Sequence, residues 1–600
     1  MRKKFIFFVL VVVALVSCTR KSYFFEKTLE FPSFVNDEQK IELSAYLIPT
    51  QQQLEWQELE LTAFVHFGMN TFTGKEWGDG TDNPSLFNPT DFDAEQWVKL
   101  LKESGFKMII LTAKHHDGFC LWPTKTTQYS VASSPWRNGQ GDIVQEVKNA
   151  CDKYGLNFGV YLSPWDRNAP IYGNTKEYNN FFISQLKELL TNYGEIKEVW
   201  FDGANGETET GKIQKYDWAS YYHVIDSLQP KAVKAIMGND IRWVGNEKGL
   251  GRETEWSVTP LNPEINDEIV SENRSLGISP TSKDLGSRQL IARSKKLYWY
   301  PSEVDVSIRP GWFYHPEQDH QVKSLAELVD IYYKSVGMNS VLLLNIPPDT
   351  RGRIHEIDSQ RLKEFSNYIQ RVFSENKIIN NNPQKWVAKP TESKEFNLNK
   401  NNLINTILLQ EDIKEGQRVE AFRVDGFLNG AWAKLSEGTT IGHKRILKIK
   451  NTNPTKIRVT ILATRAPANI KNVGAYFAPA LVNNSPNNRK NILKKDAWKV
   501  KKENPIIVDM GDNINFAGFS YKPDSLKESV YKYNFKVSEN GNSWKTIKTG
   551  EFGNIKNNPL PQTVYFEKPQ QARFFQIETL KGANGGKPSV SLQQIEILLN

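Results

Sequence analysis

The chain between residues 58 and 350 alternates short apolar runs with longer amphipathic stretches. In four clear pairs a β-rich run precedes a stretch whose apolar residues have helical spacing: 61–68 before 94–104, 106–116 before 142–154, 157–166 before 179–193, and 198–202 before 216–228. Three more apolar segments continue the series, at 231–240, 300–308 and 339–348. Apolar runs that alternate with helices predict parallel strands whose faces are covered by those helices.

This alternation extends over about 300 residues, which favours a closed (β/α)8 barrel over an open doubly wound sheet. The first run is not followed by a glycine-rich nucleotide loop, and this weakens the dinucleotide-binding alternative. A last helical stretch, starting near residue 355, ends the unit. We therefore predict an α/β fold with a (β/α)8-like barrel at 58–375, preceded by a polar leader at 19–57.

Beyond the polar linker NNNPQKW the pattern changes to a period of two, interrupted by Asn and Gly turns. RVEAFRVDGFL, HKRILKIKN and KIRVTILAT are typical of antiparallel strands with one buried face. ENPIIVDMG near residue 503 and the closing VSLQQIEILL mark a second group of such strands. We predict that the barrel is followed by C-terminal β-sandwich domains at 385–480 and 481–600.

The N-terminus has the layout of an export signal. MRKK is followed by the apolar FIFFVLVVVALV and by LVSC, which resembles the bacterial lipobox. We predict a lipoprotein signal peptide at 1–18, lipidation of Cys18, and attachment to a membrane in the periplasm or at the outer membrane. An uncleaved anchor helix is the alternative. Cys120 and Cys151 belong to no Cys/His cluster, so two buried thiols are favoured, with a disulfide as the alternative.

Composition and charge add two limits. A chain of 600 residues is too long for one hydrophobic core, and its 16 Trp exceed what cores usually need, which is consistent with a pocket for flat-faced ligands such as sugars. The net charge is +8, and residues 481–600 hold 18 Lys+Arg against 11 Asp+Glu. These lysines are scattered singly, which favours a solvated surface over a nucleic-acid site.

Polar side chains end four successive predicted strands. His66 ends the first strand, His115 and His116 the second, Tyr161 to Asp166 the third, and Asp202 the fourth. In a parallel barrel all carboxyl ends open on one face, where the loops build the site. Each of these residues alone could have a purely structural role; an Asp before Gly, for example, commonly forms a turn. Together they predict a functional site at this rim.

Two chemistries fit these residues. His66, His115, His116 and Asp202 could bind a metal ion in a barrel metallohydrolase. However, neighbouring residues on a strand should point to opposite sides, and the spaced HxH of such barrels is missing. Hydrolysis of a glycosidic bond needs two carboxyl groups, one charged and one protonated. Asp202 fits the charged role, because N–H donors of nearby His and Trp would favour its carboxylate.

Five blocks carry a family resemblance: FVHFGMNTFTGKEWGDG at 64–80, LTAKHHDGFCLWPTKTTQYSV at 111–131, VYLSPWD at 160–166, EVWFDGANG at 198–206 and DIRWVGNEKG at 240–249. In this order they resemble glycoside hydrolase family 29, the retaining α-L-fucosidases, over roughly 58–375. The resemblance implies a barrel followed by a β-sandwich, and double displacement at the anomeric carbon of fucose. It also implies that no metal and no cofactor take part.

Site residues follow from the same resemblance. Asp202 matches the nucleophile of the family. Other positions match residues that hold the sugar: His66, Glu76, Trp77, His115, His116, Tyr161, Trp200 and Arg242. Trp312, in RPGWFY, would flank the methyl side of the fucose ring.

The resemblance places the acid/base less directly. Glu247, in RWVGNE, matches the form of the subgroup that acts on α-1,3/1,4-linked fucose of branched glycans. Its neighbours Trp243 and Val244 provide the semi-apolar setting that a raised pKa requires. Glu303, in YPSEVDVS, is the rival, and the RETEW carboxylates Glu253 and Glu255 are further alternatives.

Residues 481–600 resemble a discoidin-type (coagulation factor 5/8 C-terminal) sandwich. Such domains often bind carbohydrate and sometimes hold a structural Ca²⁺, although a purely structural appendage is equally consistent with this sequence. The expected partners of the whole chain are fucosylated glycans. A surface glycan-binding lipoprotein without catalysis is the competing function, and the intact HFG, HHDGF and WFDG blocks argue against it.

Overall fold

A computed structural model of the chain describes residues 24–205, 211–265, 267–379, 386–399, 403–481, 498–503, 505–524, 528–552, 554–556, 559 and 561–599. The predicted signal peptide and Cys18 lie outside these residues. Within the described part of the chain, none of the helices combines the length and the apolar character needed to cross a bilayer.

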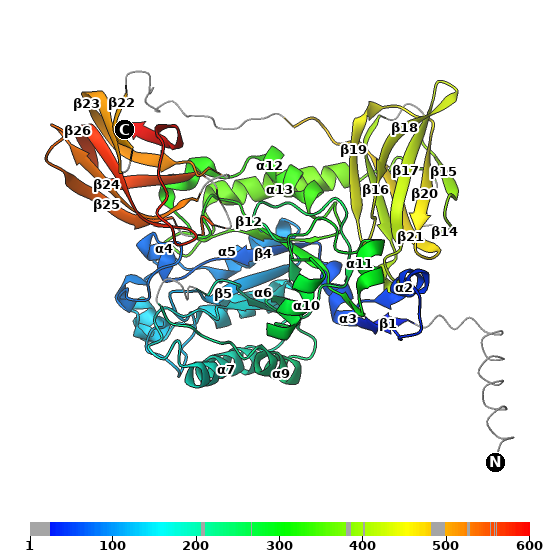
Figure 1. Cartoon of the computed structure of the whole chain (residues 1–600), viewed down its shortest axis with the longest axis horizontal. Coiled ribbons are helices and arrows are strands. Elements are labelled where there is room, and N and C mark those ends of the chain that lie inside the picture. The colour runs from blue at the N-terminus through cyan, green and yellow to red at the C-terminus, as the bar shows by residue number, and fades with distance from the viewer. Residues whose placement is uncertain are drawn as a thin grey trace, which may run out of the picture.

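The barrel consists of eight strands whose neighbours pair in parallel, in the order β8-β7-β6-β5-β4-β13-β12-β9. Their bounds are β4 Leu61–Val65, β5 Met108–Lys114, β6 Asn157–Leu162, β7 Glu198–Phe201, β8 Val233–Ile236, β9 Arg242–Trp243, β12 Ser302–Ser307 and β13 Val341–Asn345. A single antiparallel bridge, Met237 to Arg242, joins the two end strands. The barrel is therefore nearly closed, which confirms the predicted architecture (Figure 1).

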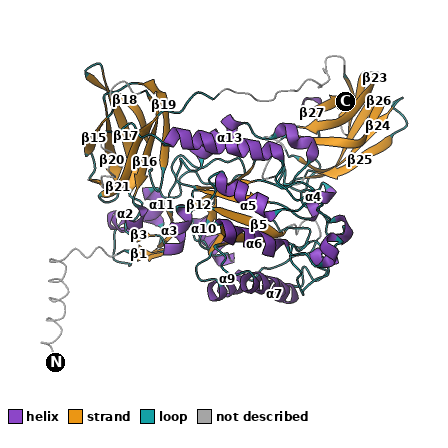
Figure 2. Ribbon diagram, turned by 180° about the vertical axis from the view of Figure 1, so that it is seen from behind, coloured by secondary structure: helices purple, strands orange, loops and turns teal. Residues whose placement is uncertain are grey.

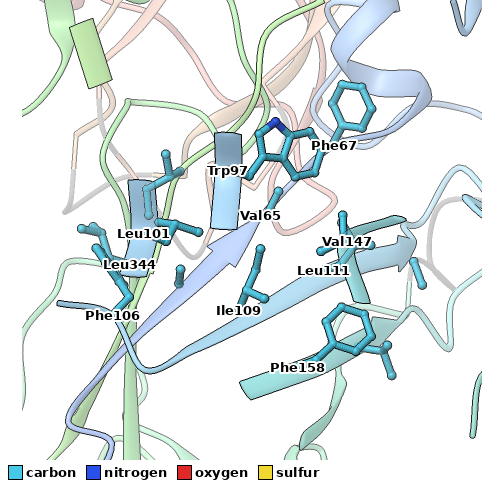
Figure 3. Packing of buried hydrophobic residues seen from close by; sticks show 14 of the residues in the cluster. Val65, Phe67, Trp97, Leu101, Phe106, Ile109, Leu111, Val147, Phe158 and Leu344 are labelled. Atoms are coloured by element: carbon cyan, nitrogen blue, oxygen red, sulfur yellow. The ribbon is translucent and has the colours of Figure 1, made fainter. Parts of the chain in front are cut away.

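Helices surround the barrel: α4 Met69–Thr73, α5 Ala94–Glu103, α6 Ile143–Tyr154, α7 Thr175–Asn192, α9 Trp218–Leu228, α10 Asp267–Ser275, α11 Arg288–Arg293, α12 Leu325–Lys334 and α13 Glu356–Phe373. Asp93 and Asp142 cap α5 and α6 by accepting hydrogen bonds from backbone N–H groups. The buried helix faces meet the outward side chains of the strands. Trp97 of α5, for example, packs on Phe67, two residues beyond the end of β4, with ring centroids 5.3 Å apart (Figure 3).

The sequence pattern missed one strand. The missed strand is β9, the sixth of the eight along the chain; it has only two residues, and five residues rather than a helix separate it from β8. A run of two residues carries no periodicity, so it had no signal of its own. Between β9 and β12 the chain instead inserts β10 (Val258–Thr259), α10, α11 and β11 (Lys296–Trp299).

The predicted polar leader is instead part of the folded barrel unit. Its described residues form β1 (Phe25–Glu26), β2 (Thr28–Glu30), α2 (Asp37–Ser44), β3 (Leu47–Ile48) and α3 (Gln51–Gln57), and β2 pairs with β11. Helix α3 packs under the barrel, where the Trp56 indole donates to Glu198 Oε2 at 2.7 Å. Gln53 is also buried and donates to two backbone carbonyls. Buried glutamines gave this segment the polar composition that concealed its fold.

Strand β7 shows why the barrel interior ends in an acid. Val199 and Phe201 belong to the apolar layer between strands and helices, whereas Trp200 belongs to the interior cluster with Phe64 and Tyr161. Because side chains alternate along a strand, the next inward position after Trp200 is Asp202. The interior below is filled by aromatic and aliphatic side chains, so Asp202 lies at the open mouth.

Both C-terminal units consist of antiparallel sheets, which confirms the predicted fold class, whereas the domain bounds 385–480 and 481–600 stay predictions. The first unit has two four-stranded sheets, β14-β21-β16-β19 and β15-β20-β17-β18, and the second has one sheet, β22-β23-β26-β24-β25, with β27 paired to β23. Their bounds are β14 Trp386–Ala388, β15 Ser393–Asn397, β16 Ile404–Glu411, β17 Val419–Leu428, β18 Ala431–Gly438, β19 Arg445–Thr452, β20 Lys456–Thr464, β21 Ala468–Tyr476, β22 Lys499–Glu503, β23 Ile506–Tyr521, β24 Val530–Ser538, β25 Lys545–Glu551, β26 Gln562–Gly582 and β27 Ile595–Leu599. The two units lie at opposite ends of the molecule (Figure 2). Cys120 and Cys151 are buried free thiols, as favoured.

A buried ion pair stabilises the loop after β6. The Lys114 ammonium, fully buried, donates to Asp166 Oδ2 at 3.0 Å and to Gln185 Oε1 at 2.9 Å. Asp166 in turn accepts from the backbone N–H groups of Asn168 and Ala169. This strand-end acid, expected at the functional rim, is therefore structural.

We expect Lys114→Met to destabilise the barrel by about 3–5 kcal/mol, because it leaves the Asp166 charge buried without its partner. Lys75→Met is the matched control: its ion pairs with Asp79 and Asp82 are partly exposed and contribute about 1 kcal/mol or less. Urea unfolding followed by tryptophan fluorescence measures both losses. Equal losses in the two variants would contradict this reading of the pair.

Candidate active site

A cavity of about 830 Å³ opens at the carboxyl ends of the barrel strands. Four carboxyl groups line it, from Asp202, Glu247, Asp305 and the exposed Glu264. Most of the predicted sugar-binding residues line it too: His66, Trp77, His115, His116, Trp200, Arg242 and Trp312. Most of the residues that we assigned to one site from the sequence thus lie around the same cavity in the structure.

The Asp202 carboxyl group is held by two donors. The Tyr161 hydroxyl donates to Oδ2 at 3.1 Å, and the backbone N–H of Ala204 donates to Oδ1 at 2.7 Å. Burial raises the pKa of Asp202 above its ordinary value, whereas these hydrogen bonds lower it. The expected donors were His and Trp side chains, and this detail was wrong, because the nearest histidine nitrogen, Nε2 of His116, is 3.7 Å from Oδ2.

The adjacent histidines do not point to opposite sides, contrary to the expectation. Strand β5 ends at Lys114, so His115 and His116 lie in the following turn and are free of strand alternation. Their ring centroids are 4.1 Å apart and both line the cavity. Burial lowers the pKa of both rings well below the ordinary value, and it lowers the pKa of His66 to about 4. All three histidines are therefore neutral at pH 7.

Hydrogen bonds at Nδ1 fix the tautomers of two of these rings. His66 Nδ1 lies 2.8 Å from the Asn345 side-chain oxygen, which can only accept, so His66 Nδ1 carries the proton. The Ser163 hydroxyl donates to the Trp165 carbonyl, so it accepts from His116 Nδ1 at 2.8 Å. In both neutral rings Nε2 then keeps its lone pair, which suits a ligand hydroxyl that donates.

Glu247 has the setting of an acid that holds its proton. Its Oε2 accepts from the Trp312 indole at 3.1 Å and from the side-chain amide of Asn554. Burial, helped by the negative charges of Asp305 and Asp202, raises the pKa of Glu247 well above its ordinary value. The cavity thus holds one carboxyl group supported by donors and one that favours protonation.

Glu303 lies one layer deeper than the cavity. It is fully buried, accepts from the Trp200 indole at 2.7 Å, and faces Glu198. On β12 it is two residues before Asp305, about 7 Å further into the barrel. Glu303 is absent from the cavity lining, so it supports the Trp200 floor from below.

Two other predicted residues, Glu76 and Arg242, hold neighbouring parts of the site in place. The Glu76 carboxylate accepts from the Trp312 backbone N–H and lies 2.8 Å from His315 Nε2, so it orders the Trp312 loop. The guanidinium of Arg242 is ion-paired with the buried carboxylate of Glu255 and donates to two backbone carbonyls. Glu255 is thus occupied structurally, and the Glu253 side chain is 78% exposed, away from the cavity.

Among the residues that the structure describes, no cluster of three or more His, Cys, Asp or Glu side chains has the arrangement of a metal site. The groups around the cavity instead resemble a sugar-binding site, with aromatic faces, neutral histidines and carboxyl groups. Two carboxyl groups that differ in their tendency to ionise are the requirement for glycosidic-bond hydrolysis.

Comparison with known proteins agrees with this geometry. The family model described as Alpha-L-fucosidase matches residues 42–372, and that described as F5/8 type C domain matches residues 469–592. The chain is 41% identical over 462 residues to Alpha-L-fucosidase 1 of Arabidopsis thaliana, covering 72% of this chain and 87% of that protein. The chain belongs to the α-L-fucosidase family.

Solved structures of fucosidases share its architecture. A putative α-L-fucosidase of Bacteroides ovatus is 52% identical with a TM-score of 0.76, over 96% of this chain and 100% of that chain. A Ruminococcus gnavus family 29 fucosidase in complex with fucose is 31% identical with a TM-score of 0.64, over 72% of this chain and 95% of that chain. The predicted family and the enzyme class, an α-L-fucosidase of family 29, are confirmed.

Sequence reasoning missed two side chains in this fucosidase. Asp305 follows Glu303 by two residues, so the alternation in SEVDVS would have placed it on the same inward face. Its Oδ1 accepts from the Trp243 indole at 2.8 Å, and burial together with the charge of Asp202 raises its pKa to about 7. Asn554 lies 307 residues from the Glu247 that it contacts, and no local pattern reports such a contact.

We expect Asp305→Asn to move the alkaline limb of the pH profile to lower pH. Above about pH 7 the ionised Asp305 opposes ionisation of Glu247 and so raises its pKa. Asparagine keeps an oxygen for the Trp243 indole but removes that charge, so the pKa of Glu247 falls. The kcat/KM for a fucosylated trisaccharide, measured from pH 4 to 10, reports the shift. An upward movement of the limb would contradict this coupling.

Proposed function

We propose that this fucosidase is a retaining exo-enzyme that removes terminal L-fucose by double displacement, with Asp202 as nucleophile and Glu247 as acid/base. The observation that carries the proposal is the contrast between the two carboxyl groups in one cavity. Asp202 accepts from a hydroxyl and a backbone N–H, while Glu247 is buried with a strongly raised pKa. Retaining hydrolysis needs these two different states at the same pH.

In the first step an Asp202 oxygen attacks the anomeric carbon while Glu247 gives its proton to the glycosidic oxygen. The bond to the leaving sugar breaks with its electron pair on that oxygen, and a fucosyl ester of Asp202 remains. In the second step Glu247, now a carboxylate, takes a proton from water. The resulting oxygen attacks the anomeric carbon, and Asp202 leaves as a carboxylate.

The surrounding groups support binding of a single terminal sugar. The floor is closed by Trp200, whose indole is held by Glu303, so the substrate enters by one end. His66 and His116 offer Nε2 lone pairs to sugar hydroxyls, and Trp77 and Trp312 offer apolar faces. Support for Glu247 over Glu303 as the acid is positional, because only Glu247 lines the cavity.

For the linkage we propose α-1,3- and α-1,4-linked fucose on branched glycans. The RWVGNE form around Glu247 supports it, and so does a cavity of about 830 Å³, which has room beyond one fucose for a branched leaving group. The test is incubation with α-1,2, α-1,3, α-1,4 and α-1,6 fucosylated oligosaccharides while free fucose is measured. We expect release from the α-1,3 and α-1,4 substrates at least tenfold faster, about 1.4 kcal/mol in the barrier. Equal or faster release from the α-1,2 or α-1,6 substrates would overturn the linkage proposal.

We also propose export and membrane attachment through a lipid on Cys18, supported by the MRKK-apolar-LVSC layout. A Cys18→Ser variant should move from the membrane fraction to the soluble fraction. The structural Ca²⁺ of the C-terminal sandwich stays a prediction.

A further inference from the structure

The C-terminal sandwich forms one wall of the active-site cavity. Tyr531, Asn554, Ile555, Lys556 and Lys581 all line it, although the barrel supplies both carboxyl groups of the proposed mechanism. The contact between the two units is specific. Tyr531 packs on Trp77 with ring centroids 5.9 Å apart, and Glu551 lies 3.8 Å from the Arg167 guanidinium. This arrangement places the sandwich at the site itself rather than at the edge of the molecule.

Asn554 is the residue of this wall that contacts the chemistry. Its side-chain amide donates to Glu247 Oε2, the same oxygen that accepts from the Trp312 indole. Among the described residues, both hydrogen bonds to this carboxyl group end on Oε2. Oε1 is therefore the oxygen that can hold the proton and deliver it to the leaving group.

The backbone at Asn554 is in the left-handed region, with φ 61°. Only glycine adopts this conformation without strain, and asparagine is among the few other residues that tolerate it. The Asn554 side chain is also buried, with 9% of the residue exposed. A buried asparagine in this conformation, directed at the carboxyl group of the proposed acid, indicates a constraint from function.

We infer that Asn554 is a positioning residue for the acid/base, and that the sandwich builds the leaving-group side of the site. The inference rests on the proposed role of Glu247. The amide fixes the carboxyl plane so that Oε1 faces the glycosidic oxygen. It also stabilises the carboxylate that forms when the proton has left, which lowers the pKa of Glu247.

The test compares Asn554→Gly with the wild type on two substrates. Glycine removes the amide and suits φ 61°, so the backbone is not strained. For a fucosylated trisaccharide, which needs a proton donor, we expect kcat/KM to fall roughly ten- to hundredfold, the effect of one hydrogen bond to a charged group. For 4-nitrophenyl α-L-fucoside, which has a good leaving group, we expect less than about a threefold change. The alkaline limb for the trisaccharide should move to higher pH.

Two further variants make the result unambiguous. Asn429→Gly is the matched control, because Asn429 is an exposed asparagine with φ 49° in the other sandwich. We expect this variant to leave kcat/KM unchanged for both substrates. Asn554→Asp tolerates the same backbone but places a negative charge against Glu247, so the alkaline limb should move up further. Thermal unfolding of all three variants checks the fold.

The inference is overturned if Asn554→Gly lowers kcat/KM equally for both substrates, or for neither, and leaves the alkaline limb of the pH profile unchanged. Its failure is separable from failure of the proposed function. If Glu247→Ala keeps the kcat/KM for the nitrophenyl fucoside, which reports only the first step, and loses that for the trisaccharide, the acid is correctly assigned and only Asn554 is misassigned. If Glu247→Ala affects both substrates equally, the assignment of the acid itself is wrong.

Discussion

Replacing Asp202 by alanine is expected to leave a folded protein whose turnover of 4-nitrophenyl α-L-fucoside falls at least about a thousandfold, because the covalent route is lost. The fold should tolerate the change, since the Asp202 side chain is 24% exposed in the cavity. The Tyr161 hydroxyl and the Ala204 N–H would lose their acceptor, and water that enters the space of the removed carboxylate can replace it. Steady-state kinetics measures the loss, and thermal unfolding checks the fold.

Azide provides the positive control for this variant. A small anion can enter the space of the missing carboxylate and attack the anomeric carbon from the same side. We expect azide to restore part of the activity and to give a β-linked fucosyl azide. Near-normal turnover of Asp202→Ala without azide would contradict the assignment of the nucleophile.

The second large effect is expected for Glu247→Ala. Loss of a general acid typically costs about 10²–10⁴ in rate where the leaving group needs a proton. We therefore expect kcat/KM for a fucosylated trisaccharide to fall within that range. The first step on a nitrophenyl fucoside should change little, because nitrophenolate leaves without protonation. Parallel kinetics on the two substrates measures the difference.

Two other glutamates serve as comparisons for Glu247. Glu253→Ala should resemble the wild type, because that side chain is exposed away from the cavity. Glu303→Ala should lower kcat/KM for both substrates to a similar extent, since it removes the acceptor that holds the Trp200 indole in the floor of the cavity. If Glu303→Ala instead loses kcat/KM for the trisaccharide but keeps it for the nitrophenyl fucoside, and Glu247→Ala does not, Glu303 is the acid.

Much of this fold could be predicted because its strands are long enough to carry a pattern. In β7 the alternation around Trp200 determines both the buried faces and the inward direction of Asp202. The histidines that end β4 and follow β5 were placed at the rim by the same logic. Parallel strands bring their carboxyl ends together, so residues distant in sequence could be assigned to one site.

What the sequence did not reveal depends on contacts without periodicity. Helix α3 seals the barrel with buried glutamines, and their polar composition resembles that of a surface segment. The depth of Glu303 relative to Asp305 depends on where each strand ends inside the barrel. Asn554 reaches Glu247 only through the docking of a separate domain. None of these features has a local signal in the chain.

The most direct test of the mechanism is the configuration of the fucose that is first released. Proton NMR can follow the anomeric signals of a fucosylated trisaccharide during the first minutes, before mutarotation mixes the anomers. Double displacement through Asp202 inverts the anomeric carbon twice, so we predict that α-L-fucose appears first and β-L-fucose later. Initial release of β-L-fucose would contradict the account, because it would mean a single displacement by water with no covalent intermediate on Asp202.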